Sequence, residues 1–128
     1  MKKIISIIAI LMLVMGCTSN SEEEPIDSVI GVWKLTSIKT MAQEFINDCR
    51  SKDKIEVRQD KTFTINGHNE DDNCAPQTSS GTWSANLTNT YKFSAAGDTQ
   101  TFTLKNNNTL TFSFVQDGNS IVYSYTKQ

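Results

Sequence analysis

TLTFSFVQDGNSIVYSYT, residues 109–126, alternates apolar and polar side chains on either side of an Asp-Gly pair. Every second residue from 110 to 114 is Leu or Phe, and every second residue from 121 to 125 is Ile or Tyr. A period of two is typical of a half-buried strand, and Asp117-Gly118 is a strong signal for a tight hairpin turn. The stretch therefore predicts an antiparallel hairpin with one apolar face.

The same alternation recurs in six further short runs, at 31–38, 54–58, 62–66, 81–85, 91–95 and 99–105. Turn residues separate most of them, as in Gln59-Asp60-Lys61 and Asn106-Asn107-Asn108. Eight short strands with hairpin connections predict an all-β chain, folded as a small antiparallel up-and-down eight-stranded barrel. Such a barrel pairs every strand edge and can hold one small ligand. A sandwich and a flattened, incompletely closed barrel are the alternatives.

Two connections are longer than hairpin turns. Residues 40–53 contain MAQEFI at 41–46, for which we expect a short helical turn or a lid, and residues 67–79 are polar and are expected to form a long loop. Within this second connection, residues 68–73 (HNEDDN) collect carboxylates of the kind that bind Ca²⁺. They lack the spacing of a calcium-binding loop, so we expect a solvated turn and no metal site.

Residues 1–16 have the features of a secretory leader, with Lys2 and Lys3 before an apolar run and Gly16 at its end. The apolar run is thirteen residues long, whereas a membrane-spanning helix needs about 20. The Gly-Cys pair that ends the leader resembles the lipobox of bacterial lipoproteins, which implies a lipid on Cys17. Two or more acyl chains would hold the protein to a membrane essentially permanently. The alternative is an ordinary cleaved signal peptide in which Cys17 is incidental.

Residues 17–27 are expected to form a flexible acidic tether, because TSNSEEEPI at 18–26 has too little apolar surface to fold. The run Ser21-Glu22-Glu23-Glu24 resembles the acidic export signal of surface-exposed lipoproteins in the Bacteroidetes group. The resemblance implies an outer membrane lipoprotein at the cell surface, or else one that faces the periplasm. The alternative is a solvated linker that is merely acidic. Residues 28–128 then form a single domain, with no room for a second.

Three cysteines remain to be assigned, and a lipid on Cys17 leaves Cys49 and Cys74 as an even pair. Outside the cytoplasm such a pair persists as a disulfide. The loop it closes is worth roughly 3 kcal/mol in the chain-entropy account. Two free thiols or an intermolecular bond are the alternatives. The absence of a CxxC motif and the presence of one His argue against a zinc site.

The composition excludes several functions. The formal net charge is −2, without clusters of Lys or Arg, which argues against nucleic acid or anionic lipid as a partner. The sequence has no Gly-x-Ser-x-Gly motif, and a single His with no free nucleophile does not indicate catalysis. We therefore expect a protein that is not an enzyme and has no cofactor.

Two Gly-x-Trp motifs, Gly31-Val32-Trp33 and Gly81-Thr82-Trp83, accompany the Cys49 and Cys74 pair, Asp60-Lys61-Thr62-Phe63-Thr64 and Asn108-Thr109-Leu110-Thr111. This combination resembles the lipocalin-like domain family of small Bacteroidetes lipoproteins, over about residues 28–126. The resemblance implies a barrel whose closed end is plugged by Trp33. In typical lipocalins an Arg near the end of the last strand packs on this Trp. Here Lys127 is the only basic candidate.

The inward phase of the strands is rich in aromatic residues, so a ligand held by it would be small and apolar. Filling a core is the alternative role for the same side chains. The second functional hypothesis is a structural or interaction module with a filled core, which binds an envelope protein through 40–53 and 67–79. The candidate ligand-binding residues are Phe45, Trp83, Tyr91, Phe93, Phe112 and Tyr123.

Overall fold

The alternating runs form antiparallel strands in the computed structural model, which describes residues 27–128. The expected leader, the lipid on Cys17 and nearly all of the tether lie outside the described residues. Residues 27–128 contain nine strands, one of them only two residues long, and one 3-10 helix. The elements are β1 (Gly31–Thr40), β2 (Gln43–Glu44), η1 (Arg50–Lys52), β3 (Lys54–Val57), β4 (Thr62–Asn69), β5 (Ala75–Ala85), β6 (Thr90–Ala95), β7 (Asp98–Lys105), β8 (Thr109–Gln116) and β9 (Asn119–Lys127).

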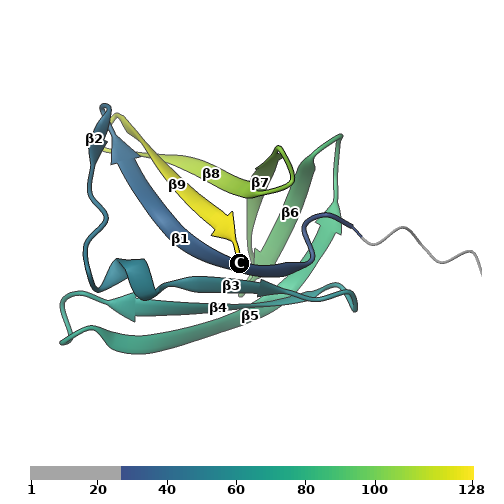
Figure 1. Ribbon diagram of the computed structural model, residues 1–128, viewed down its shortest axis with the longest axis horizontal. Helices are drawn as coiled ribbons and strands as arrows, with labels where there is room; N and C mark the ends of the chain where they lie inside the picture. The colour runs from purple at the N-terminus through teal and green to yellow at the C-terminus, as the bar shows by residue number, and fades with distance from the viewer. Residues whose placement is uncertain (1–26) are drawn as a thin grey trace, which may run out of the picture.

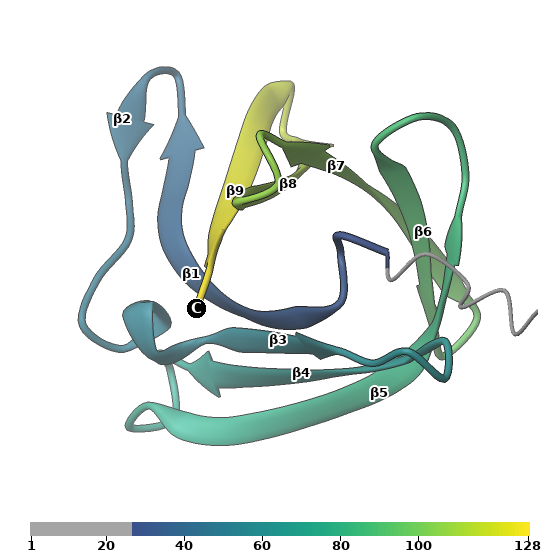
Figure 2. The ribbon, with the colours of Figure 1, turned by 45° about the vertical axis from the view of Figure 1, so that its right-hand side comes forward.

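Each long strand pairs with the next one along the chain, and β9 returns to pair with β1 (Figure 1). In this closing ladder Leu35 lies opposite Tyr125 and Ile38 opposite Tyr123, with a bulge between Leu35 and Ser37. Figure 2 shows β3, β4 and β5 as one wall of the barrel, with β8 and β9 across from them and β1 curving from β3 to β9. The predicted up-and-down eight-stranded barrel is confirmed, and each of its eight long strands corresponds to one of the eight predicted runs, although β3 ends one residue before Arg58.

The expected helical turn or lid at residues 41–46 is wrong. Met41 and Ala42 both have positive φ, which makes a tight turn and brings β2 back alongside β1. The Glu44 carboxylate then accepts hydrogen bonds from the Ile38 amide and the Ser37 hydroxyl, each at 2.7 Å. These bonds fasten the segment as a short edge strand, which a pattern of hydrophobic spacing does not reveal.

The expected long loop at residues 67–79 is also wrong. β4 continues to Asn69 and β5 begins at Ala75, so that a short turn joins two long strands. Asn73 and Cys74, both at positive φ, reverse the chain in this turn. The outer part of this hairpin extends past the body of the barrel, and β5 is mostly exposed on both faces there (Figure 1). A strand that buries neither face has no need of alternating hydrophobicity, and its sequence therefore resembles a loop.

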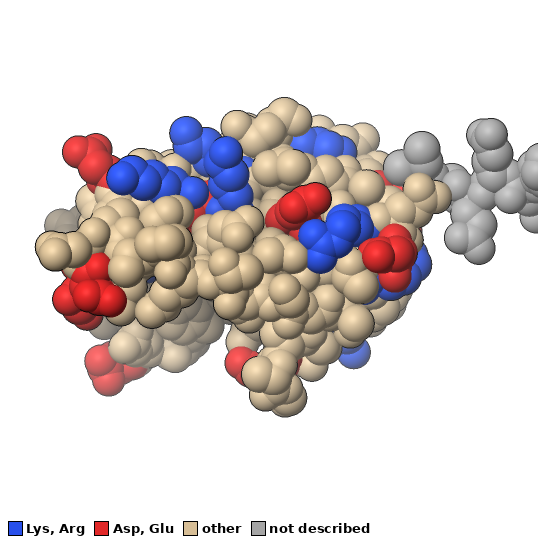
Figure 3. All heavy atoms as spheres, turned by 90° about the horizontal axis from the view of Figure 1, so that it is seen from below, with Lys and Arg blue, Asp and Glu red and all other residues tan. Residues whose placement is uncertain are grey.

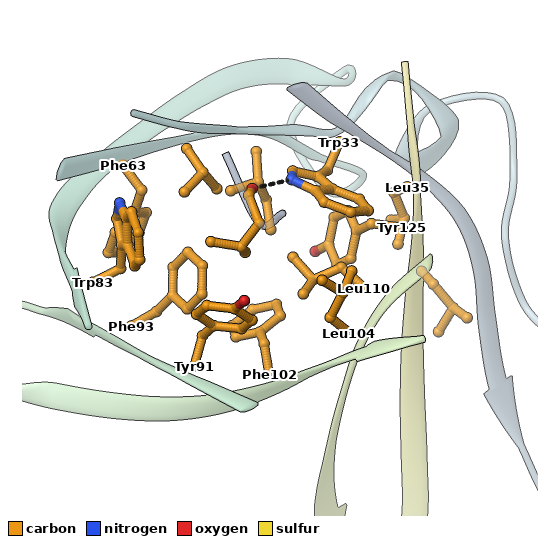
Figure 4. Packing of buried hydrophobic residues seen from close by; sticks show 14 residues of the cluster. Trp33, Leu35, Phe63, Trp83, Tyr91, Phe93, Phe102, Leu104, Leu110 and Tyr125 are labelled. Atoms are coloured by element: carbon orange, nitrogen blue, oxygen red, sulfur yellow. Dashed lines mark hydrogen bonds between the residues drawn. The ribbon is translucent and has the colours of Figure 1, made fainter. Parts of the chain in front are cut away.

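The inward side chains of all the long strands pack into one cluster, together with Val29 ahead of β1 (Figure 4). Its most deeply buried members are Val29, Trp33, Leu35, Ile55, Val57, Phe63 and Leu110. Within residues 27–128, no helix is both long and apolar enough to cross a membrane.

Candidate functional site

The two ends of the barrel differ, and the one where β1 begins and β9 ends is closed. Trp33 is completely buried there, and its indole N–H donates a hydrogen bond to the Val29 carbonyl at 2.7 Å. Lys127 places its Nζ 5.4 Å from the centre of the Trp33 ring and donates to the Ser28 carbonyl at 2.9 Å. Lys127 thus covers the tryptophan from the last strand, where typical lipocalins have an Arg.

A second tryptophan seals the neighbouring part of the closed end. The Trp83 indole N–H donates to the Arg58 carbonyl at 2.8 Å, and Tyr91 packs edge-on against the ring at 6.0 Å between centroids. Lys61 lies over the same ring, 4.1 Å from its centre, and pairs with Asp27 at 3.3 Å. Both indole N–H groups are therefore satisfied, and the closed end is a packed plug.

The opposite end of the barrel is open because its strands separate. The β7–β8 ladder ends at Thr103 and Thr111, after which β7 stays paired with β6 and β8 with β9. Between these diverging strands and the β4–β5 hairpin lies a cavity of about 380 Å³. We call it the aromatic cavity, because seven aromatic residues line it. They are Phe63, Phe93, Phe102, Phe112, Phe114, Tyr123 and Tyr125.

One wall of the aromatic cavity presents nearly parallel rings. Phe112 and Tyr123 are 5.0 Å apart between centroids with 19° between their planes, and Phe114 lies 5.7 Å from Tyr123 at 27°. The rings of Phe93 and Phe102 continue the aromatic surface inward, 4.6 Å apart. Flat ring faces of this kind offer van der Waals contact to a planar apolar molecule.

Arg50 of η1 sits at the rim of the aromatic cavity, with its guanidinium carbon 5.6 Å from the centre of the Tyr123 ring. Its Nε donates to Asp53 at 2.8 Å, and the other Asp53 oxygen lies 3.0 Å from His68 Nδ1. Burial disfavours the charge on Arg50, but the Asp53 carboxylate and, to a smaller extent, Tyr123 together raise the pKa of the guanidinium. Asp53, only 5% exposed, therefore sits between two side chains that can donate hydrogen bonds to it.

A second concavity of about 400 Å³ adjoins the first, and we call it the polar hollow. It shares Arg50, Ile65 and Tyr125 with the aromatic cavity, so the two meet at these three residues. Its other lining residues are Asp53, Gly67, His68, Asn69, Glu70, Asp71 and Gln77. In the part of the chain that the structure describes, no three His, Cys, Asp or Glu side chains come together in a way that would hold a metal ion.

The Cys49–Cys74 disulfide ties the rim together, and its prediction is confirmed. It joins the residue before η1 to the turn between β4 and β5, with 5.5 Å between the Cα atoms. Asn47 and Glu70 add a hydrogen bond between the same two segments. Because Arg50 follows Cys49 directly, the disulfide holds the guanidinium at the mouth of the cavity.

Comparison with known proteins places the fold in a family. The family model for the lipocalin-like domain matches residues 29–112. The chain belongs to the lipocalin-like domain family. A solved structure of a redesigned beta barrel is similar to this lipocalin-like domain, with a TM-score of 0.51 and 13% identity, over 79% of this chain and 92% of that one. At this identity the likeness shows the fold alone. No curated protein matches the chain.

Only half of the candidate ligand-binding residues of this lipocalin-like domain line the aromatic cavity, namely Phe93, Phe112 and Tyr123. Trp83 and Tyr91 belong to the closed end, and Phe45 is 51% exposed and outside the cavity. The alternation of the strands also predicts that Phe102, Phe114 and Tyr125 point inward, so the sequence could have indicated these three residues as well. Arg50 lies in an irregular connection, where no periodic signal marks it.

Proposed function

We propose that this lipocalin-like domain is a binding protein whose aromatic cavity takes a small apolar molecule. The supporting observation is a solvent-open cavity of about 380 Å³ walled by aromatic rings, which is within the usual range for small-molecule sites. Nine of the thirteen lining residues are aromatic or aliphatic, so apolar contact supplies most of the affinity. The polar members of the lining are Arg50, Ser79, Asp98 and Gln100. No catalytic role is proposed for any residue of the cavity.

The proposal includes a lipid anchor at Cys17 and a place in the bacterial outer membrane, either at the cell surface or facing the periplasm. The Cys49–Cys74 disulfide supports an extracytoplasmic site, because such bonds persist in oxidising compartments. The described chain starts beside the closed end, where Asp27 pairs with Lys61. Asp27, the last residue of the expected tether, is thus at the closed end and not at the cavity mouth.

The anchor is tested by the substitution Cys17→Ala in cells of the source organism. The variant is expected in the soluble fraction after lysis, whereas the native protein sediments with the membranes. A variant that still sediments with membranes would refute lipidation at Cys17.

The ligand site is tested by filling the cavity. Ala95 lines it, whereas Ala85 is exposed on β5 outside it, so Ala95→Trp and Ala85→Trp add the same bulk at two places. Native mass spectrometry of protein purified from its own cells should show a retained small molecule in the native chain and in Ala85→Trp, but not in Ala95→Trp. Equal retention by both variants would place the ligand elsewhere.

A second candidate function is an interaction module that binds an envelope protein. It is favoured by Met41 and Phe45, which are 73% and 51% exposed around β2 although both are large and apolar. The disulfide also joins this connection to the β4–β5 hairpin. Under this hypothesis, the variant Met41→Ser with Phe45→Ser loses a co-purifying protein while Ala95→Trp retains it. Under the cavity hypothesis, no co-purifying protein depends on Met41 and Phe45.

A further inference from the structure

The hydroxyl of Tyr125 has no partner in the barrel. Tyr125 is only 6% exposed, and its backbone pairs with Leu35 on one side and Leu110 on the other (Figure 4). Among residues 27–128 no hydrogen bond joins this hydroxyl to another group, although both buried indoles are satisfied. The hydroxyl is still open to the concavities that it lines, since Thr40 Oγ1 is the one fully buried side-chain polar atom without a partner among residues 27–128. A ligand that covers the Tyr125 hydroxyl cuts it off from solvent, and this costs free energy unless the ligand offers a hydrogen-bond acceptor.

The Tyr125 side chain lies where the aromatic cavity and the polar hollow meet. It lines both, together with Arg50 and Ile65. A molecule in the aromatic cavity therefore brings one end to this junction. Burial and the nearby Asp53 carboxylate raise the pKa of Tyr125, so its hydroxyl stays protonated and can donate a hydrogen bond.

The charges around the junction disfavour an ionised ligand. Arg50 and Asp53 are already paired with each other at 2.8 Å, so neither a carboxylate nor an ammonium group of the ligand would find an unpaired opposite charge at the junction. Either ion would also lose its hydration beside Tyr125, and burying an unpaired charge is costly. An uncharged oxygen that accepts a hydrogen bond satisfies the tyrosine without either penalty.

We propose that the apolar ligand carries an uncharged carbonyl or hydroxyl oxygen, which accepts a hydrogen bond from the Tyr125 hydroxyl at the junction of the two concavities. This inference rests on the proposed function, because it places the ligand body against the parallel rings of Phe112 and Tyr123. Beyond the proposed function, the inference specifies the polar group of the ligand that fixes its orientation in the cavity. The ligand is thus a flat, neutral molecule with one polar end.

The experiment uses two naphthalenes of nearly the same shape, 2-acetylnaphthalene and 2-isopropylnaphthalene, of which the first alone has an oxygen. Binding to the native protein and to Tyr125→Phe is measured by fluorescence titration. The substitution should weaken binding of the ketone about fivefold, the usual effect of one hydrogen bond. It should change binding of the hydrocarbon less than twofold. The matched control is Tyr91→Phe, since Tyr91 is also buried but does not line the cavity, and this variant should change neither affinity.

Charged analogues test the neutrality of the oxygen. 2-Naphthoate and 2-naphthylmethylammonium should both bind the native protein more weakly than the ketone. Tighter binding of either ion would overturn the assignment of a neutral group. If Tyr125→Phe leaves the ketone affinity unchanged while both neutral probes bind, the inference about Tyr125 fails and the proposed function stands. If neither neutral probe binds the native protein, the apolar site and the inference fail together.

Discussion

The closed and open ends of this barrel are made from the same strands and the same alternation, yet one is a packed plug and the other a cavity. At the closed end Trp33 and Trp83 are pinned by hydrogen bonds to carbonyls and covered by Lys127 and Lys61. At the open end β7 and β8 separate beyond Thr103, and Phe112, Phe114 and Tyr123 stack on one another beside a cavity. Aromatic content therefore does not decide which end is filled. Strand separation does.

The face of the molecule shown in Figure 3 gives no comparable contrast in charge. On the face shown in Figure 3, Lys and Arg side chains are interspersed with Asp and Glu, without a large patch of either sign. Charge on this face therefore does not distinguish the two ends of the barrel. Four experiments test how these regions of the molecule differ.

The largest effect is expected from Trp33→Ala. Loss of a fully buried tryptophan should lower the free energy of unfolding by about 3–5 kcal/mol. Phe114→Ala at the open end should cost less than about 1 kcal/mol, because this ring is only half-buried and already borders a void. Urea unfolding of both variants measures the difference. Equal losses would mean that the two ends are packed alike.

Removing the disulfide should have the next largest effect. Cys49→Ser with Cys74→Ser frees the loop between them and should cost roughly 3 kcal/mol of unfolding free energy. Because Arg50 follows Cys49, the variant should also bind 2-acetylnaphthalene more weakly at concentrations where it is still folded. Reduced native protein is the control for the serine side chains. If it binds like the oxidised form, the disulfide does not shape the cavity rim.

Adding a methyl group to the glycine at position 81 should lower the stability by an intermediate amount. In Gly81→Ala the added carbon would run into the Ser94 carbonyl and approach the Phe63 ring to 2.9 Å, which should cost about 1–3 kcal/mol. The matched substitution Gly67→Ala lies toward the open end, where the new carbon would be 3.7 Å from the Gln77 carbonyl. It should be nearly neutral. A melting temperature that falls equally in both variants would contradict this account.

The smallest effect is expected for the pH dependence of the contacts that hold β2 against β1. Hydrogen bonds from Ser37 and from the Ile38 amide lower the pKa of Glu44 below its ordinary value of 4.5. The ionised carboxylate therefore stabilises the turn above that pH, and this contribution is lost as the pH falls through the lowered pKa. NMR should show the Ile38 and Ile46 amide signals shifting together in acid. In Glu44→Gln the shift should be absent, and its persistence there would exclude Glu44 as the cause.

Much of the fold could be predicted because burial imposes a period of two on every strand that packs against the core. Trp33, Phe63 and Leu110 all follow this phase and are buried. The errors fall where burial imposes nothing, at the exposed β4–β5 hairpin and at the turn through Met41 and Ala42. The candidate site was predicted only in part, because an inward phase is common to residues that plug the closed end and residues that line the cavity.

By itself the sequence determined the alternation that predicts a barrel and the inward face of each strand, because alternation is a local property of the chain. It predicted the Cys49–Cys74 pair from the expectation that a lipid occupies the third cysteine, Cys17. Only the tertiary structure decided that Trp83 and Tyr91 fill one end while Phe112 and Tyr123 border a void at the other. It also brought Arg50 to Tyr123 and left the Tyr125 hydroxyl at a junction of two concavities. These outcomes depend on the distances between strands, and no local pattern encodes a distance across the barrel.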